Sequence, residues 1–198
     1  CQEASSCDSG NGYVSNYECL AKSNCSNSGM CVLGTSCETI PSGYYKGSDN
    51  TCELYSACDN ASQCVTGGAC TAIPSGYYKA SDNTCALYSA CTDSGKCVTG
   101  GACTTIPANN YKDGNNVCQA YSNCGEGNCV SGTSCVAIPT NNYKDTDYTC
   151  KANSNCGSGS CVSGTSCTTI GSSQYKGTDY KCYDNTTCGT GSCVSSGA

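Results

Sequence analysis

Hydrophobic residues occur along this chain in short runs, separated by stretches rich in Asp, Asn, Gly and Ser. None of the runs repeats its apolar positions with the 3.6-residue period of an amphipathic helix. Glycine occupies 24 of the 198 positions and interrupts regular structure throughout. The pattern therefore predicts a mostly β and irregular protein built from short strands, turns and loops.

Four evenly spaced cysteines recur along the chain. In one copy, five residues separate each of Cys52, Cys58, Cys64 and Cys70 from the next, and a 14-residue spacer leads to Cys85. Each copy is 32 or 33 residues long, which indicates a tandem array. Such short units cannot bury their few apolar residues alone, so neighbouring units are expected to stack into an extended rod. The predicted repeats are 19–51, 52–84, 85–117, 118–149 and 150–181, with partial repeats at 1–18 and 182–198.

Two features of the repeat predict its local structure. The segment between the second and third cysteines shortens from five residues (59–63) to four (125–128) and is rich in turn-forming residues, so it is predicted to be a hairpin tip. The core is predicted to combine the cysteines with an isoleucine and a valine from each repeat, and with a tyrosine that recurs in three repeats. These residues are Ile40, Ile73, Ile106, Ile138 and Ile170; Val32, Val65, Val98, Val130, Val162 and Val194; and Tyr55, Tyr88 and Tyr121.

The composition is that of a small disulfide-rich protein, with 25 cysteines in 198 residues. Phe and Trp are absent and large aliphatic residues are scarce, so apolar burial alone cannot offset the entropy lost on folding. Disulfides persist only in oxidising compartments, which predicts an extracellular or cell-surface location. The C-x2-C knuckles typical of zinc sites are missing, so no metal is predicted. The cysteines predicted to form disulfides are Cys19, Cys25, Cys31, Cys37, Cys52, Cys58, Cys64, Cys70, Cys85, Cys91, Cys97, Cys103, Cys118, Cys124, Cys129, Cys135, Cys150, Cys156, Cys161 and Cys167.

Spacing alone leaves the pairing of these cysteines open, because four cysteines allow three connectivities. An interlocked pairing, first to third and second to fourth, is frequent in small domains. The half-repeat that contains Cys1 and Cys7 instead favours closure of third to fourth. The total number of cysteines is odd and a further cysteine is expected just after Ala198, so the array is predicted to continue beyond the given sequence.

The net charge and the residue types present argue against several classes of function. A net charge of −6 argues against nucleic acid and anionic membranes as partners, and no apolar stretch has the length of a membrane span. Histidine, the commonest general base, is absent, and the recurring features point to no unique active site, so neither an enzyme nor a cofactor is predicted. Aspartates in the spacers are weighed as calcium ligands, but solvated turn carboxylates are favoured because no EF-hand loop is present. These residues are Asp49, Asp82, Asp145, Asp147 and Asp179.

Tyr-Lys pairs and glycosylation sequons are the remaining candidate sites. The pairs lie at 45–46, 78–79, 111–112, 143–144 and 175–176. They could grip a partner or a sugar by stacking and cation–π contact, but the favoured interpretation is structural, with each tyrosine covering a neighbour's disulfide and each lysine snorkelling outward. Three sequons predict N-linked glycans at Asn24, Asn60 and Asn185.

The run IPSGYYKGSDNTC at 40–52, followed by evenly spaced cysteines, resembles the repeats of growth-factor-receptor-like, or furin-like, cysteine-rich regions. Long arrays of such repeats, rich in Ser, Thr, Asn and Gly, are similar to the surface coat proteins of protists, such as ciliate immobilisation antigens. This resemblance implies a surface location and an extended shape, and no catalytic residues.

The sequence as a whole predicts an extracellular structural protein, a disulfide-stabilised and glycosylated part of a cell-surface coat or filament. Self-association is expected, since length scales with the number of repeats. The alternative is the ectodomain of a receptor or adhesin that binds a protein or sugar through its spacer loops.

Overall fold

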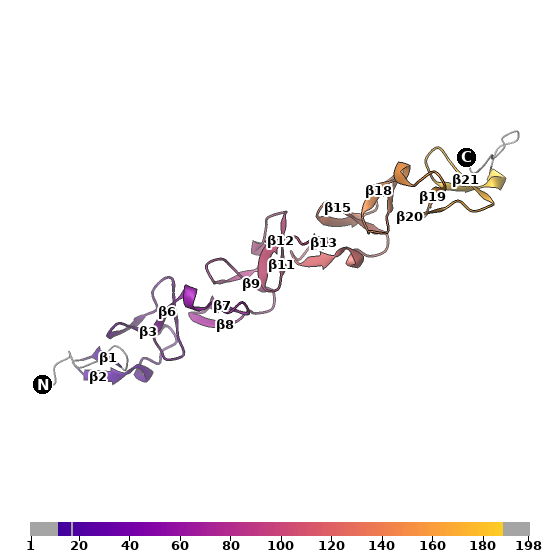
Figure 1. Cartoon of the computed structure of the whole chain (residues 1–198). Coiled ribbons are helices and arrows are strands. Elements are labelled where there is room, and N and C mark those ends of the chain that lie inside the picture. The colour runs from indigo at the N-terminus through magenta and orange to yellow at the C-terminus, as the bar shows by residue number, and fades with distance from the viewer. Residues whose placement is uncertain (1–11, 17, 188–198) are drawn as a thin grey trace. The chain divides into compact units, whose positions relative to one another are not determined.

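The computed structural model describes residues 12–16 and 18–187, and its regular elements there are short β-strands and single-turn 3-10 helices (Figure 1). The chain divides into two compact units, Cys1–Cys91 with Val98–Thr104, and Thr92–Cys97 with Thr105–Ala198. No helix in the described part of the chain is long and apolar enough to cross a membrane. The predicted disulfide-rich repeat fold with short strands is confirmed, whereas the stacking of the repeats into a rod stays a prediction.

Each full repeat contains one hairpin with four residues in each strand. In β7, Cys64 and Val65 face opposite sides of the strand and both are buried, one in a disulfide and the other in the core. The tip between β7 and β8 is Gly67-Gly68, and positive φ at both residues gives the turn whose twist suits a two-residue hairpin. The four-residue pairs are β3 (Met30–Leu33) with β4 (Ser36–Thr39), β7 (Gln63–Thr66) with β8 (Ala69–Ala72), β15 (Asn128–Ser131) with β16 (Ser134–Ala137), and β19 (Ser160–Ser163) with β20 (Ser166–Thr169). The strands β11 (Lys96–Thr99) and β12 (Ala102–Thr105) occupy the corresponding positions of another repeat.

A second, shorter hairpin is formed by the spacer and the first cysteine of the next repeat. Its five-residue connection is turned by an aspartate that accepts backbone hydrogen bonds and by a residue with positive φ, such as Asp49 and Asn50. The short pairs are β5 (Tyr44–Lys46) with β6 (Cys52–Leu54), β9 (Tyr77–Lys79) with β10 (Cys85–Leu87), β13 (Asn110–Lys112) with β14 (Cys118–Ala120), β17 (Asn142–Lys144) with β18 (Cys150–Ala152), and β21 (Gln174–Lys176) with β22 (Cys182–Asp184). Near the N-terminus, β1 (Gly12–Ser15) pairs with β2 (Glu18–Ala21) in the same way but with a connection of only two residues. That shorter connection accounts for the short spacer before Cys19.

The predicted hairpin tip between the second and third cysteines is wrong. This segment follows a 3-10 helix rather than a strand, so it joins that helix to the first strand of the four-residue hairpin. The turn-forming residues are real turn residues, as the bond from Gln63 N to Asn60 O shows, but no strand precedes them. The 3-10 helices are η2 (Lys22–Asn24), η3 (Tyr55–Ala57), η4 (Tyr88–Ala90), η5 (Tyr121–Asn123), η6 (Asn153–Asn155) and η7 (Asn185–Thr187).

Two disulfides per repeat follow a single rule along the described chain. The second cysteine pairs with the fourth, and the third pairs with the first cysteine of the following repeat. Counted from the second cysteine, the pairing is therefore interlocked, and closure of third to fourth does not occur among the described residues. We call such a set a covalent unit, for example Cys58, Cys64, Cys70 and Cys85. The pairs are Cys25–Cys37, Cys31–Cys52, Cys58–Cys70, Cys64–Cys85, Cys91–Cys103, Cys97–Cys118, Cys124–Cys135, Cys129–Cys150, Cys156–Cys167 and Cys161–Cys182.

The core consists of separate small clusters, each with a buried tyrosine, cysteine and valine. Tyr45 packs with Cys58 and Val65, so the tyrosine of one covalent unit covers the Cys58–Cys70 disulfide of the next. The structural interpretation of the Tyr-Lys tyrosines is thereby confirmed for this pair. The other clusters are Tyr13, Cys25 and Val32; Tyr78, Cys91 and Val98; Tyr111, Cys124 and Val130; and Tyr143, Cys156 and Val162.

The predicted isoleucines contribute less to this core than expected, while the tyrosines of the 3-10 helices line it as predicted. Ile40 and its counterparts are half-buried and belong to none of the clusters. Their place is at the junction of successive hairpins, where the Ile40 side chain lies against Gly68. Tyr55 is partly buried against the cluster of Tyr45. Val194 lies outside the described residues.

Within the described part of the chain, backbone hydrogen bonds connect a short hairpin with the tip of the four-residue hairpin that follows it. Lys46 N donates to Gly68 O at 2.8 Å, and Lys144 N donates to Thr165 O at 2.8 Å in the same way. Beside the first of these contacts, a Cβ on Gly68 would lie 2.9 Å from Ile40 Cδ1. Glycine at 68 therefore serves two purposes, a positive φ and the close approach of the preceding unit.

Candidate functional site

The Tyr-Lys pairs do not present their lysines to a partner. Lys46 Nζ donates to Cys25 O at 2.7 Å and to Asn27 O at 2.8 Å, and so ties the loop after the second cysteine to the short hairpin. Lys144 Nζ repeats the arrangement with Cys124 O at 2.8 Å and Gly125 O at 3.0 Å. The predicted outward snorkelling of these lysines is wrong, because each ammonium group donates inward to two backbone carbonyl oxygens. A gripping surface made of these pairs is thus not formed.

The tyrosine of the first described pair has a charged neighbour. The Tyr45 hydroxyl donates a 2.5 Å hydrogen bond to the Glu53 carboxylate, which stands opposite it in the register of β5 and β6. Burial, with this hydrogen bond and the negative charge of Glu53 added, raises the pKa of Tyr45 to about 12. Position 53 corresponds to Ala86, Gln119 and Lys151 in later repeats, so the acidic contact is local and not a repeated site.

The spacer aspartates weighed as calcium ligands are engaged in turns. Asp49 Oδ1 accepts from the backbone N and the hydroxyl of Thr51, and Asp147 Oδ1 accepts from both groups of Thr149. These hydrogen bonds lower the pKa of both carboxyl groups. Asp82 and Asp179 also have a lowered pKa, whereas Asp145 Oδ1 accepts only from Thr146 N. Among the described residues, no group of three or more acidic or cysteine side chains could hold a metal ion.

The three predicted glycosylation sites differ in their surroundings. Asn60 is exposed in the loop before β7, and its side-chain oxygen accepts hydrogen bonds from both Ser62 N at 3.0 Å and Ser62 Oγ at 2.8 Å. Asn24 is also exposed but directly precedes Cys25, which is buried in a disulfide. Asn185 opens η7 and is exposed. Geometry thus favours Asn60 as an acceptor, while the presence of glycans stays a prediction.

In the first compact unit, a shallow groove of about 450 Å³ lies where successive hairpins meet. The Ile73-Pro74 turn and the Gly100-Gly101 tip form part of its lining, and Tyr77 and Tyr88 supply two aromatic rings. No charged residue lines this groove.

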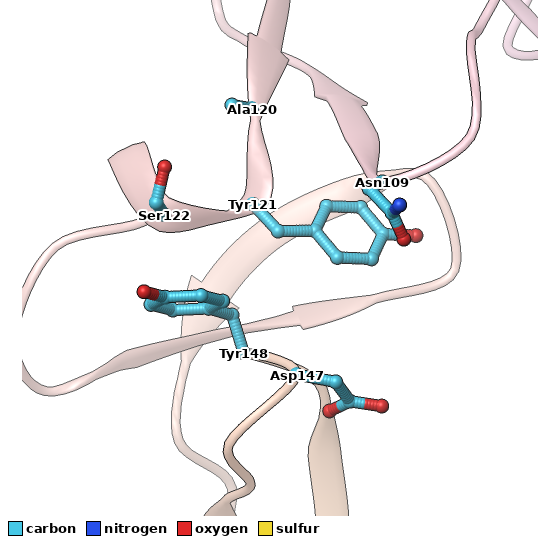
Figure 2. A pocket seen from close by; sticks show the side chains of 6 residues that line it. All are labelled: Asn109, Ala120, Tyr121, Ser122, Asp147 and Tyr148. Carbon is cyan, nitrogen blue, oxygen red and sulfur yellow. The ribbon is translucent and has the colours of Figure 1, made fainter.

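In the second compact unit, a smaller hollow of about 270 Å³ lies between two tyrosines (Figure 2). Tyr121 begins η5, and Tyr148 stands in the turn between β17 and β18, so the hollow joins two successive repeats. Asn109, Ser122 and Asp147 add polar groups to the lining. Figure 2 shows the ring of Tyr121 beside the Asn109 side chain and the ring of Tyr148 across the open space.

Sequence reasoning placed Tyr121 in the core and overlooked Tyr148. Tyr121 does contact the cluster of Tyr111, yet it also lines this hollow. A signal for Tyr148 was present: the same turn position holds Asn50, Asn83 and Asn116 in earlier repeats and becomes tyrosine at 148 and 180.

The cysteines predicted as disulfide-forming are brought together pairwise as described above, and Cys19 is also disulfide-bonded. These bonds and the hollows between repeats are the features around which a function can be argued. Comparisons of the chain with protein-family models, with curated protein sequences and with solved structures gave no match.

Proposed function

We propose that this chain is an extracellular structural repeat protein that forms part of a cell-surface coat or filament. The observation that supports this role is the way in which one repeat completes the next. The tyrosine of one covalent unit packs on a disulfide of the following unit, and the third cysteine of each repeat bonds to the first cysteine of the next. A chain built by this rule can be lengthened by copies without a new core.

Resistance to unfolding and proteolysis is the property that this construction favours. Within a covalent unit, the sequence span closed by Cys58–Cys70 overlaps the span closed by Cys64–Cys85, so little chain between 58 and 85 is free to open. Each such loop closure is worth about 3 kcal/mol in the chain-entropy account. Disulfides in this density persist only in an oxidising compartment, which is the basis for the proposed extracellular location.

Glycans on the exposed asparagines and self-association of the chain are parts of the same proposal. Polar neutral surfaces that carry sugar would keep a dense coat hydrated, and no catalytic role is proposed. The experiment that tests the role is electron microscopy of the native, unreduced protein as isolated. Regular fibrils or a repeating coat are expected, and the same material after reduction serves as the control. Separate short particles at high protein concentration would contradict the proposal.

A receptor or adhesin is the second candidate, favoured by one observation. Hollows lined by tyrosines lie between successive repeats in each compact unit, and such surfaces suit a ligand. Under that alternative, the isolated protein stays dispersed and binds a defined partner.

A further inference from the structure

We propose that the hollow between Tyr121 and Tyr148 binds a single ring of a neutral sugar. Its volume of about 270 Å³ lies just below the range of roughly 300–1,000 Å³ usual for drug-sized ligands, so one small ring is the fitting occupant. This inference goes beyond the proposed structural role. A coat or filament can form without a sugar site, and the site can bind a sugar whether or not the chain assembles.

Backbone strain at Tyr148 is the first observation behind this assignment. Tyr148 has a φ of 65°, in the left-handed region that costs an L-residue about 1–2 kcal/mol. Asparagine tolerates this region better than other non-glycine residues, and asparagine is found at the corresponding positions 50, 83 and 116. A tyrosine that replaces the locally favoured residue points to a use for its ring, since strain of this kind is concentrated at functional sites.

The ring of Tyr148 lies next to a fixed lysine and is also partly exposed. Lys144 Nζ lies 5.1 Å from the ring centroid, and the same ammonium is fixed by Cys124 O and Gly125 O. Tyr148 nevertheless keeps 39% of its surface exposed, and the exposed part borders the hollow. A positioned but accessible aromatic ring is suited to stack on the apolar face of a pyranose, because it gives up little conformational freedom on binding.

The remaining lining contains polar groups whose chemistry suits sugar hydroxyls. The Asn109 amide both donates and accepts, the Ser122 hydroxyl does the same, and the Asp147 carboxylate accepts from hydroxyl groups. One carboxylate oxygen, Oδ1 of Asp147, is already engaged by Thr149, whereas Oδ2 is 3.9 Å from an exposed lysine, Lys151. The lining itself contains a carboxylate and no cation, so an anionic sugar is disfavoured by charge.

A natural control lies one repeat further along. Tyr180 has a φ of 66°, and its ring centroid lies 5.1 Å from Lys176 Nζ. Its backbone conformation and its lysine contact are therefore the same as those of Tyr148. The residue that corresponds to Tyr121 there is Asn153, which is only 3% exposed and donates weakly to Asp179 O. That junction therefore lacks the second ring, and it should not bind the sugar.

The test uses the full chain and a panel of neutral methyl glycosides: glucoside, galactoside, mannoside and N-acetylglucosaminide. Binding is followed by saturation-transfer and amide chemical-shift NMR. At least one glycoside is expected to bind with a dissociation constant on the order of 1–10 mM, as suits a single ring. The variants Y148N and Y121N carry residues that other repeats use at these positions, so they should fold, and each should weaken binding at least tenfold.

The matched variant Y180N should leave binding unchanged, and methyl glucuronide should bind at least tenfold more weakly than the best neutral glycoside. The proposal is overturned if none of the four neutral glycosides binds. Equal binding by the Y121N/Y148N double variant, or equal weakening by Y180N, would overturn it as well, since either result would place the site elsewhere. A negative result leaves the structural role unaffected, because electron microscopy tests that role independently.

Discussion

The side-chain ammonium of Lys79 donates a 2.6 Å hydrogen bond to the backbone carbonyl of Cys58, 21 residues earlier in the chain. It also donates to Asn60 O at 2.9 Å, so one cation holds the loop between the second and third cysteines. The same contact recurs from Lys46 to Cys25 and from Lys144 to Cys124. The lysine of each of these Tyr-Lys pairs therefore acts inside its covalent unit.

Replacing Lys79 with methionine should destabilise this loop. The variant keeps most of the aliphatic stem but leaves two carbonyl oxygens without their donor, which we expect to lower the free energy of unfolding by about 1–2 kcal/mol. Guanidinium-induced unfolding with the disulfides intact measures the loss, and amide hydrogen exchange over residues 59–62 localises it. Lys96→Met is the control, because Lys96 makes only an exposed ion pair with Asp93. Equal stability of the two variants would show that the Lys79 contact contributes nothing.

A second prediction concerns the contact between Ile40 and Gly68. Asparagine tolerates positive φ, so Gly67→Asn, where no atom lies within 4 Å of an added Cβ, should cost a few tenths of a kcal/mol. Gly68→Asn should cost about 1–3 kcal/mol, since its Cβ would fall 2.9 Å from Ile40 Cδ1. Combining Gly68→Asn with Ile40→Ala should recover part of this loss in a double-mutant cycle measured by chemical unfolding. Additive losses would mean that the two residues do not touch in solution.

Alkaline titration tests the hydrogen bond between Tyr45 and Glu53. The folded-state pKa of Tyr45 is raised to about 12 from its ordinary value near 10, so the folded protein holds this proton more tightly than the unfolded chain. The associated stability is fully present below pH 10 and is lost as the pH rises from 10 to 12. Phenolate absorbance should show one tyrosine that ionises at a higher pH in the unsubstituted protein than in the Glu53→Gln variant. An unchanged titration curve in Glu53→Gln would rule out the carboxylate as a cause.

The sequence predicted the repeat, the short strands and the use of the cysteines, because each depends on local composition and spacing. The pairing of the cysteines could not be predicted, since Cys64 has candidate partners in its own repeat and in the next. Only the three-dimensional path of the spacer brings Cys85 to within a Cα–Cα distance of 5.1 Å of Cys64. The same path brings Lys79 onto Cys58, and spacing gives no sign of that contact.

The hollow at Tyr121 and Tyr148 was missed for a different reason. A tyrosine in a repeat with few large apolar residues was assigned to the core, and Tyr121 does line a core cluster. What separates a core tyrosine from a binding one is the exposed face, which depends on the neighbouring repeat. Tyr148 could have been noticed as the replacement of an asparagine in a turn, but its left-handed backbone is visible only in the structure.

Digestion at lysine without reduction distinguishes the observed disulfide pairing from pairing within each repeat. Cleavage after every lysine, in mild denaturant, divides residues 23–151 into the peptides 23–46, 47–79, 80–96, 97–112, 113–144 and 145–151. All six should remain together, because Cys31–Cys52, Cys64–Cys85, Cys91–Cys103, Cys97–Cys118 and Cys129–Cys150 join each peptide to the next.

The covalent fragment should end at Lys151, since no disulfide between described residues spans residues 151–155. Pairing of first to third within each repeat would give the opposite result. Cys150 would then bond to Cys161 and bridge the cut after Lys151, while nothing would bridge the cut after Lys79. Intact-mass spectrometry of the unreduced digest separates the two outcomes, and a break after Lys79 would refute the interlocked covalent unit on which the proposed structural role depends.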